Sequence, residues 1–324
     1  MIKKIALLSC IPLLVACSPH KDPEMLKIIC PTGAPALAFF DEGNNPNFVT
    51  NSTPTLVAAE LQKNEYDVVV FDAVNGLKSI KKNEGNYQLA KVITGGNFYL
   101  ACINKEADSS GNYPLPAPED KVVSFGEGLL PDLVYKKLAA DKWSITNTPT
   151  YVNGVSDAQT VLMEGQYGGA SVDYVFIAEP ALTAAMSTAT ASTYGKVNIV
   201  KNIRAEWKEL TGQDGLVQAG VFINKDTLKN NEIRVTELMN QLKGRIEIAI
   251  NQPEQAAASL DVFGNADEQK TKFGFASPIV KKVQAGGKNG FGLVSFNETI
   301  DVNTFLTSLG QPTFEDSYFV NISI

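Results

Sequence analysis

The chain has 324 residues and a formal net charge of −7. Its length allows two domains with sizeable cores, and its acidic balance argues against nucleic acid as a partner, because that binding depends on neutralising phosphates with cations. The only histidine is His20, so histidine-dependent nucleophiles and histidine-based metal sites are disfavoured.

The N-terminus, MIKKIALLSCIPLLVAC, has the layout of a secretory signal sequence. Two lysines precede an apolar stretch that is too short to span a bilayer as a helix. The stretch ends in LVAC, which is similar to the bacterial lipobox, although an ordinary signal peptide could also contain a cysteine. We predict a signal peptide over residues 1–16, a lipid on Cys17 that anchors the protein to a membrane, and a tether over residues 17–25.

From residue 26 onward, short apolar runs alternate with helical patterns. Residues 26–30 and 67–71 predict strands, and the second run is typical of a strand covered on both faces. Residues 35–40 and 53–62 predict helices with a proline in the first turn. This alternation predicts a mostly parallel sheet with helices on both faces.

The segment NKEADSSGNYPLPAPEDK interrupts the alternation, which favours a loop or an inter-domain crossing. The alternation then restarts, and VQAGVFIN predicts a strand that returns to the first unit. We predict an α/β protein whose lobe 1 spans residues 26–103 and 219–324, with a crossing at 104–120 and lobe 2 over 121–218. Ligands would bind in a cleft between the lobes, beyond the carboxyl ends of the strands.

Cys30 and Cys102 lie in apolar, strand-like runs. They could be buried thiols or form one disulfide in an oxidising compartment. No spacing of cysteines or histidines indicates a zinc site, and no cofactor or metal is predicted.

The stretch IICPTGAPALAFF turns sharply from a strand into a helix. Gly33 permits a tight backbone path, and Pro35 suits the first turn of a helix. We expect free N–H groups near Thr32 to Ala36 to point beyond the strand and to favour an anion or a polar ring edge. The alternative is a plain turn whose amides bind water.

Two further glycine-containing turns repeat this pattern. GGNFYL places an amide and a phenol beside glycines that permit close approach, although a hairpin-like turn is equally compatible. FGEGLL is its counterpart in lobe 2, and Pro131 stands where a dinucleotide fingerprint requires a third glycine. The candidate ligand residues in these turns are Gly96, Asn97, Tyr99, Gly126, Glu127 and Gly128.

Polar side chains also flank two predicted buried strands. In VDYVFIAEP, Asp173 could face the cleft, and Glu179 could hold a ligand amine or cap the next helix. Asn75 follows the strand at 67–71, where Asp72 could instead serve as a helix cap.

In order and spacing, these motifs resemble the substrate-binding lipoproteins of ABC importers, and more narrowly the nitrate, sulfonate and thiamine-precursor type of periplasmic binding protein. The likeness covers most of residues 26–320 and rests on PTGAPALAF, DAVNG, YQLAKVITGGNFYL, FGEGLLPDLVYKKL, PTYVNGVSDAQTVLMEGQ, DYVFIAEPALTAA, FGLVSFN and TFEDSYF. It implies a periplasmic binding protein type II fold that closes on its ligand by hinge motion. Transferred to this chain, the family's ligand loops fall on Thr32, Gly33, Ala34, Asn75, Gly96, Asn97, Tyr99, Gly126, Glu127, Gly128, Asp173, Tyr174 and Glu179.

The chain departs from the family pattern in two respects. Gly95 stands where related proteins carry a bulky tryptophan, which predicts an enlarged or reshaped pocket. No arginine falls near these loops in the sequence, which argues against a bidentate clamp for nitrate, sulfate or free sulfonate. A neutral or mildly cationic organic ring fits the loops better.

The resemblance therefore implies an extracytoplasmic, monomeric, non-enzymatic protein at the cell surface or in the periplasm. It would deliver a small polar organic ligand to an ABC permease and its ATPase. The alternatives are an enzyme on the same fold acting on a small acid, a ligand sensor with a membrane partner, and a surface adhesin or structural lipoprotein.

Overall fold

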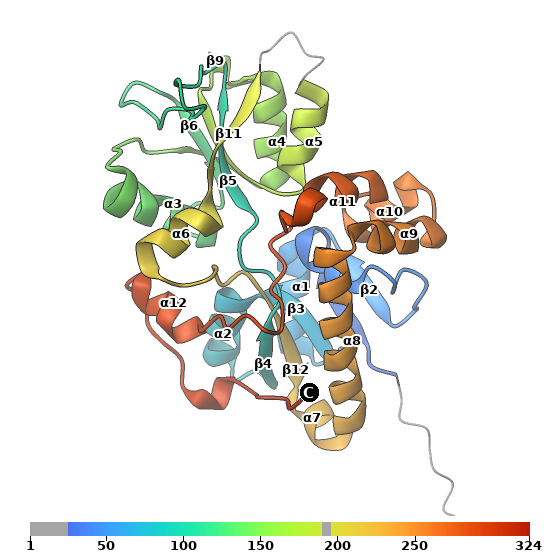
Figure 1. The fold of residues 1–324 in the computed structure, drawn as a ribbon. Coiled ribbons are helices and arrows are strands. Elements are labelled where there is room, and N and C mark those ends of the chain that lie inside the picture. Colours follow the sequence, from blue (N-terminus) through green and yellow to red (C-terminus); the bar gives the residue numbers. More distant parts are fainter. Residues whose placement is uncertain (1–24, 190–195) are drawn as a thin grey trace, which may run out of the picture.

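The computed structural model describes residues 25–189 and 196–324. Figure 1 shows two lobes stacked one above the other, with lobe 2 above lobe 1. Each lobe contains one five-stranded sheet flanked by helices, so the predicted two-lobed α/β architecture is confirmed. The predicted signal peptide, Cys17 and nearly all of the predicted tether lie outside the described residues.

The sheet of lobe 1 has the strand order β2-β1-β3-β12-β4. Its strands are β1 (Ile28–Pro31), β2 (Phe48–Asn51), β3 (Val68–Asp72), β4 (Tyr87–Val92) and β12 (Ala219–Asn224). β1 pairs in parallel with β2 and β3, whereas β12 runs antiparallel to both β3 and β4. All strands except β12 therefore share one direction.

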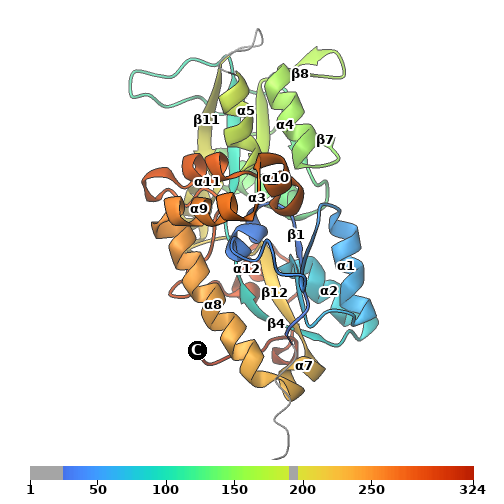
Figure 2. The same ribbon diagram turned by 90° about the vertical axis from the view of Figure 1, so that its right-hand side faces the viewer.

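Helices cover both faces of this sheet, which explains why β3 is apolar along most of its length. Val69 belongs to the hydrophobic cluster that includes α1 and α2, whereas Val68 and Val70 belong to the cluster with η1 and α8. Figure 2 shows α8 on one side of lobe 1 and α1 on the other. The helices are η1 (Ala34–Phe39), α1 (Pro54–Lys63), α2 (Ala73–Asn83), α7 (Lys225–Asn230), α8 (Glu232–Asn251), α9 (Pro253–Phe263), α10 (Ala266–Phe273) and α11 (Ser277–Val283).

The sheet of lobe 2 has the order β11-β5-β10-β6-β7. Its strands are β5 (Phe98–Ile103), β6 (Val122–Phe125), β7 (Thr150–Val152), β10 (Tyr174–Ala178) and β11 (Val197–Asn202). β10, β6 and β7 are parallel, and β5 runs antiparallel to β10 and β11. Around it lie α3 (Leu130–Leu138), η2 (Ala139–Trp143), α4 (Val155–Glu164), the hairpin β8 (Gln166–Tyr167) and β9 (Ala170–Ser171), α5 (Ala181–Ala189) and α6 (Ile203–Thr211).

One strand in each sheet is reversed because of where the chain crosses between lobes. The chain leaves lobe 1 through residues 93–97 and returns through residues 215–218, and the two segments are hydrogen-bonded to each other. Both crossing segments lie at the edge of the sheets where the parallel strands have their carboxyl ends. A strand that enters a sheet from this edge must run against its neighbours, and β5 and β12 do so.

The predicted lobe boundaries therefore need correction. Residues 99–103 are predicted in lobe 1, but β5 pairs with β10 and β11 in lobe 2. The crossing predicted at 104–120 is instead a surface loop of lobe 2, held by ion pairs from Lys105 to Asp120 and Asp173. Proline and glycine indicate a loop, but they do not reveal whether it joins two lobes.

The lobes also touch away from the crossing segments. On one side, α11 contacts α5, and Lys282 Nζ donates to Ser187 Oγ at 3.1 Å. On the other, the C-terminal helix α12 (Val302–Ser308) packs on α6, with the rings of Phe305 and Trp207 5.1 Å apart. Two short helices, η3 (Ala285–Gly287) and η4 (Asp316–Tyr318), complete the C-terminal part.

Cys30 and Cys102 are free, buried thiols in different sheets, so of the two predicted alternatives the disulfide is not formed. Burial raises the pKa of each thiol. Across residues 25–189 and 196–324, no helix combines the length and apolar character needed to span a bilayer.

Candidate functional site

Strand–helix loops from both lobes meet at the junction. The two sheets have matching strand orders. Counted outward from the crossing segments, lobe 1 has β3, β1 and β2 at the positions where lobe 2 has β10, β6 and β7. The loops that follow β3, β1 and β2 therefore lie on the edge that faces the loops after β10, β6 and β7. In open α/β sheets this edge is where ligands bind.

The loop after β1 lies at this edge, as predicted, but its amides are already used. The N–H of Thr32 donates to Asn51 O at 3.1 Å, and the N–H of Gly33 donates to Phe273 O at 2.7 Å. The prediction of free N–H groups at Thr32 and Gly33 is therefore wrong, because neighbouring loops reach them. Gly33 has a φ of 100°, and no atom lies within 4 Å of the position that its Cβ would take. The loop is thus open on the side toward which a Cβ on Gly33 would point.

In lobe 2, the loop after β6 contains Gly126, Glu127 and Gly128. Both glycines have positive φ, 68° and 71°, and Glu127 is exposed. No atom lies within 4 Å of the position that a Cβ on Gly128 would take, so this loop also borders open space. The next residue, Leu129, is the N-cap of α3 and makes no side-chain capping hydrogen bond.

Asp132, which is not among the candidate residues predicted from the sequence, holds this loop in place. Its Oδ2 accepts from the N–H of Gly128 at 2.9 Å and from Lys136 at 2.9 Å, and its Oδ1 accepts from the hydroxyl of Tyr151 at 2.5 Å. Burial would raise the pKa of Asp132, but these donors outweigh it and lower that pKa. An aspartate in the first turn of a helix after a Gly-x-Gly loop is a signal that could have found it.

The innermost pair of loops carries two acidic helix caps. Asp72 Oδ1 accepts from the N–H of Asn75 at 2.7 Å, and burial raises the pKa of Asp72 to about 6. Glu179 accepts from the N–H of Thr183 at 2.9 Å and from its hydroxyl at 2.7 Å. Burial raises the pKa of Glu179 although these bonds oppose it. The capping role predicted for Glu179 is therefore present in the structure.

Asn97 lies where both crossing segments meet lobe 2, and its side chain is buried and fully used. Its Nδ2 donates to Glu179 O at 2.8 Å, and its Oδ1 accepts from Gln218 Nε2 at 2.6 Å. Gln218 Oε1 also faces the N–H of Asn97 at 3.3 Å. Tyr99 is buried beside this group, and burial, together with the nearby Glu179 carboxylate, raises the pKa of its hydroxyl to about 12.

An arginine does lie beside these loops, which corrects the expectation from the sequence. A Cβ on Gly96 would come within 2.6 Å of Arg204 Cβ, so the stem of Arg204 lies directly against the glycine. Its guanidinium is engaged elsewhere, with Nε donating to Asp214 O at 2.9 Å and Nη2 paired with Glu298 at 2.6 Å. Arg204 is distant from Gly96 in the chain, so the sequence offered no signal for the contact.

The predicted enlargement of the pocket at Gly95 is also wrong. A Cβ there would lie 2.6 Å from Ile300 Cδ1, 2.9 Å from Leu216 O and 2.9 Å from Val294 Cγ2. Side chains from the C-terminal segment and the returning crossing therefore fill the space beside the glycine.

No protein-family model and no curated protein matches the chain in sequence. Solved structures match it closely in architecture. An ABC transporter protein from Parabacteroides distasonis has a TM-score of 0.62 and 17% identity, covering 92% of this chain and 99% of its own. The periplasmic aliphatic sulphonate binding protein SsuA from Escherichia coli has a TM-score of 0.60 and 14% identity, covering 89% and 86%.

A third solved structure, the ligand-binding component of an ABC-type import system from Staphylococcus aureus with zinc bound, has a TM-score of 0.62 and 11% identity. It covers 92% of this chain and 96% of its own. The chain has the periplasmic binding protein fold. The resemblance noted in the sequence is thereby confirmed for the fold.

Within the periplasmic binding protein fold, two predicted ligand residues lie away from the lobe junction. Tyr174 pairs with Cys102, at the end of β10 opposite to Glu179, and its hydroxyl donates to Pro114 O at 3.0 Å. Asp173 accepts from the N–H of Lys121 at 2.9 Å at that same far end. The length of β10, about 16 Å at 3.3 Å per residue, separates both from the junction. Placing Asp173 at the cleft was therefore wrong, because a parallel strand starts at the edge away from it.

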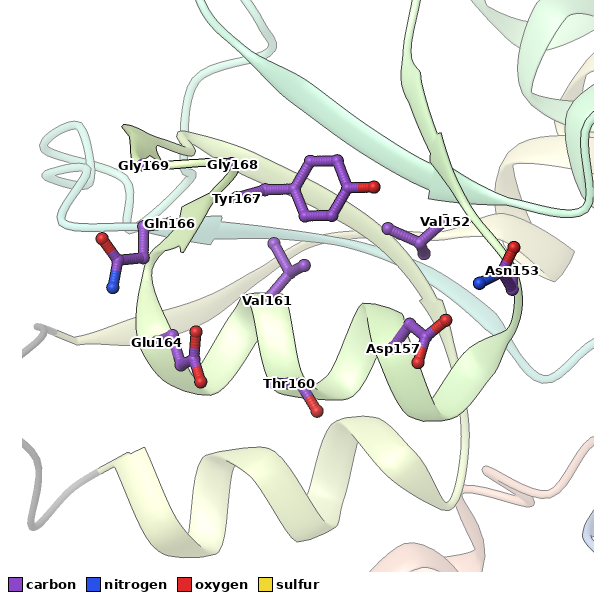
Figure 3. A pocket seen from close by; sticks show the side chains of 10 residues that line it. All are labelled: Val152, Asn153, Asp157, Thr160, Val161, Glu164, Gln166, Tyr167, Gly168 and Gly169. Atoms are coloured by element: carbon purple, nitrogen blue, oxygen red, sulfur yellow. The ribbon is translucent and has the colours of Figure 1, made fainter.

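Two cavities lie outside the set of predicted loops. One of about 410 Å³ lies between α4 and the β8–β9 hairpin, and Figure 3 shows the ring of Tyr167 above α4 beside Val161. Its lining residues are Val152, Asn153, Asp157, Thr160, Val161, Glu164, Gln166, Tyr167, Gly168 and Gly169. The other, of about 800 Å³, lies in lobe 1 between residues 43–50 and α10. Neither contains a predicted ligand residue.

Proposed function

We propose that the protein is the substrate-binding component of an ABC importer, held outside the cytoplasm by a lipid on Cys17. It captures a small polar organic solute between its lobes and presents it to a permease and its ATPase. The observation that carries this proposal is the pair of facing loop sets, joined at residues 93–97 and 215–218, in a fold shared with solved import binding proteins.

Ligand capture works by a shift of population between open and closed forms. Loops after β1 and β6 border open space at Gly33 and Gly128, and a ligand that contacts both favours closure. The Asn97–Gln218 pair keeps the two crossing segments together while the lobes move. The candidate contacts from both lobes are Thr32, Gly33, Ala34, Asn75, Gly96, Tyr99, Gly126, Glu127 and Gly128.

The charges at the junction support a neutral or mildly cationic ligand. Arg204 lies against Gly96, but its guanidinium is already paired with Glu298. Asp72, Glu127 and Glu179 make the junction acidic. A bare anion would meet carboxylates here without a free arginine to bind it.

Native mass spectrometry of the full-length protein, purified from its own host in mild detergent, tests the proposal. We expect a bound mass of a few hundred daltons that is lost on denaturation. Gly154, at the loop after β7, has extended backbone and no atom within 4 Å of a Cβ, so Gly154→Trp should fold and block the junction. Gly244→Trp, in open space on α8, is the matched control and should keep the ligand.

The contrary result is equally clear. An empty wild-type protein that a panel of vitamins, vitamin precursors, amino acids and sulfonates does not stabilise would contradict a role in solute capture. It would favour an adhesin or structural lipoprotein instead.

A further inference from the structure

Two large apolar side chains are exposed at the lobe junction. Leu129, in lobe 2, directly follows the Gly126–Gly128 loop and is 50% exposed. Leu56, in lobe 1, lies in the first turn of α1, just beyond the end of β2, and is 54% exposed. Figure 2 shows α1 extending downward from the level at which the lobes meet. A single exposed leucine needs no explanation, but one on each facing edge does.

The local structure does not account for either leucine. Leu129 occupies the N-cap of α3, a position that favours Ser, Thr, Asp or Asn, and the N–H of Gly128 is satisfied by Asp132 instead. On α1, Val57 and Leu61 are fully buried in the core, so Leu56 is on the opposite side of the helix and contributes nothing to that packing. Neither exposed side chain is therefore explained by the packing or the capping of its own helix.

The surroundings of the leucines offer room for a ligand. Pro31 pairs with Asn51 and Phe125 with Val152, so the loops after β1 and β2 are neighbours, as are those after β6 and β7. Both leucines thus belong to the outer part of the junction. Gly33, Gly128 and Gly154 border open space in the same loops.

We propose that the ligand carries an alkyl or aryl group, and that Leu56 and Leu129 enclose this group when the lobes close. The inference rests on the proposed function and narrows its ligand to amphipathic organic solutes. A bare oxyanion such as nitrate or sulfate does not fit this inference, since it would bury neither leucine against an apolar group.

The test replaces each leucine by asparagine and measures ligand retention and thermal stabilisation. The probes are two pairs of compounds, and in each pair only the second member carries a phenyl group. The pairs are methylammonium with benzylammonium and formamide with benzamide. Nitrate and sulfate are tested beside them. We expect only the larger member of a pair to stabilise the wild type. Leu56→Asn and Leu129→Asn should weaken its binding at least about tenfold, since each loses an apolar contact.

The controls are Ile233→Asn on α8 and Val262→Asn on α9, whose side chains are 70% and 82% exposed on elements outside the junction loops. They should bind within about twofold of the wild type. Because asparagine is a favoured N-cap, Leu129→Asn should fold at least as stably as the wild type, which separates lost binding from lost structure.

Three results would overturn the inference. If the retained natural ligand is a bare oxyanion, or if both leucine variants bind like the wild type, the apolar contact is absent while solute capture still stands. If neither a retained ligand nor any probe binds, the proposed function itself fails.

Discussion

In lobe 1 the loop after β1 is tied to neighbouring loops by main-chain hydrogen bonds. In lobe 2 the corresponding loop after β6 has one internal main-chain bond, from Leu129 N–H to Gly126 O, and is tied to α3 by one carboxylate. Thr32 and Gly33 donate to carbonyl groups of Asn51 and Phe273. Gly128 donates to the side chain of Asp132. The same position in two related sheets is thus fixed once by the backbone and once by a side chain.

This difference indicates which substitutions should destabilise the loop in each lobe. A loop fixed by main-chain bonds tolerates changes of its own side chains but depends on close backbone approach, here at Gly274. A loop tied to its helix by a side chain depends strongly on that one residue. Substitutions in the two loops should therefore destabilise the protein to very different extents.

The largest effect is expected for Asp132→Ala. Asp132 is 1% exposed, and its removal leaves the Tyr151 hydroxyl and the Gly128 N–H without their acceptor. We expect the free energy of unfolding to fall by about 3 kcal/mol, because two donors to a buried carboxylate lose their acceptor, with loss of ligand affinity. Chemical denaturation measures the first and calorimetric titration the second.

Thr32→Ala is the matched change in lobe 1. Its loop uses only the main chain of Thr32, so we expect a loss below about 0.5 kcal/mol. Comparable losses in both variants would show that the lobes are not held by different means.

A second, smaller effect compares two glycines. At Gly274, φ is 84° and a Cβ would lie 2.8 Å from the N atom of Gly33, so Gly274→Ala should push the two loops apart. We expect a loss of about 2 to 3 kcal/mol, combining backbone strain with the weakened hydrogen bond. Gly128→Ala meets open space and should cost only the strain of its positive φ, about 1 kcal/mol. Thermal denaturation of both variants measures the two losses of stability. Equal losses would contradict the expected difference between Gly274 and Gly128.

The smallest effect concerns Asp72, the counterpart of Glu179 in the innermost loops. Its native pKa of about 6 lies above the ordinary value of 3.8, so the folded protein binds the proton more tightly than the unfolded chain does. This contribution to stability is present below about pH 4 and is lost as the pH rises to about 6.

Asp72→Asn keeps a favoured cap but cannot ionise. It should match the wild type at pH 4 and exceed it at pH 7. The full difference in pKa corresponds to about 3 kcal/mol, but Asp72 is only partly buried, so we expect about 1 kcal/mol. Denaturation curves across this range measure the difference. A difference that does not change with pH would mean that burial does not perturb this carboxyl.

The sequence predicted the fold well because its signals are local. The apolar run at Val68–Asp72 and the glycine-proline turn after β1 report strand burial and strand–helix order directly. The lobe boundary failed because strand partners depend on distant residues. β5 follows β4 in the chain, yet its partners β10 and β11 come much later.

The site was predictable at the level of loops but not of contacts. Gly126 to Gly128 and Asn97 are at the junction, as the turn motifs indicated. Gly33, Asn97 and Gly96 contact Phe273 O, Gln218 and Arg204 respectively. These partners come from remote segments that no local pattern connects to the loops. Asp173 was misplaced because the direction of β10 depends on the whole sheet.

The position of β12 has a consequence for the order in which the protein is made. β12 lies between β3 and β4, so a ribosome that has synthesised residues 25–92 has produced four strands of lobe 1 without the strand that unites them. Until residues 219–224 emerge, β3 has an open edge and β4 has no neighbour in the sheet. Lobe 2 is complete in the nascent chain before that point. The lobe synthesised first is therefore finished last, and β3 is the edge that a chaperone would need to shield in the meantime.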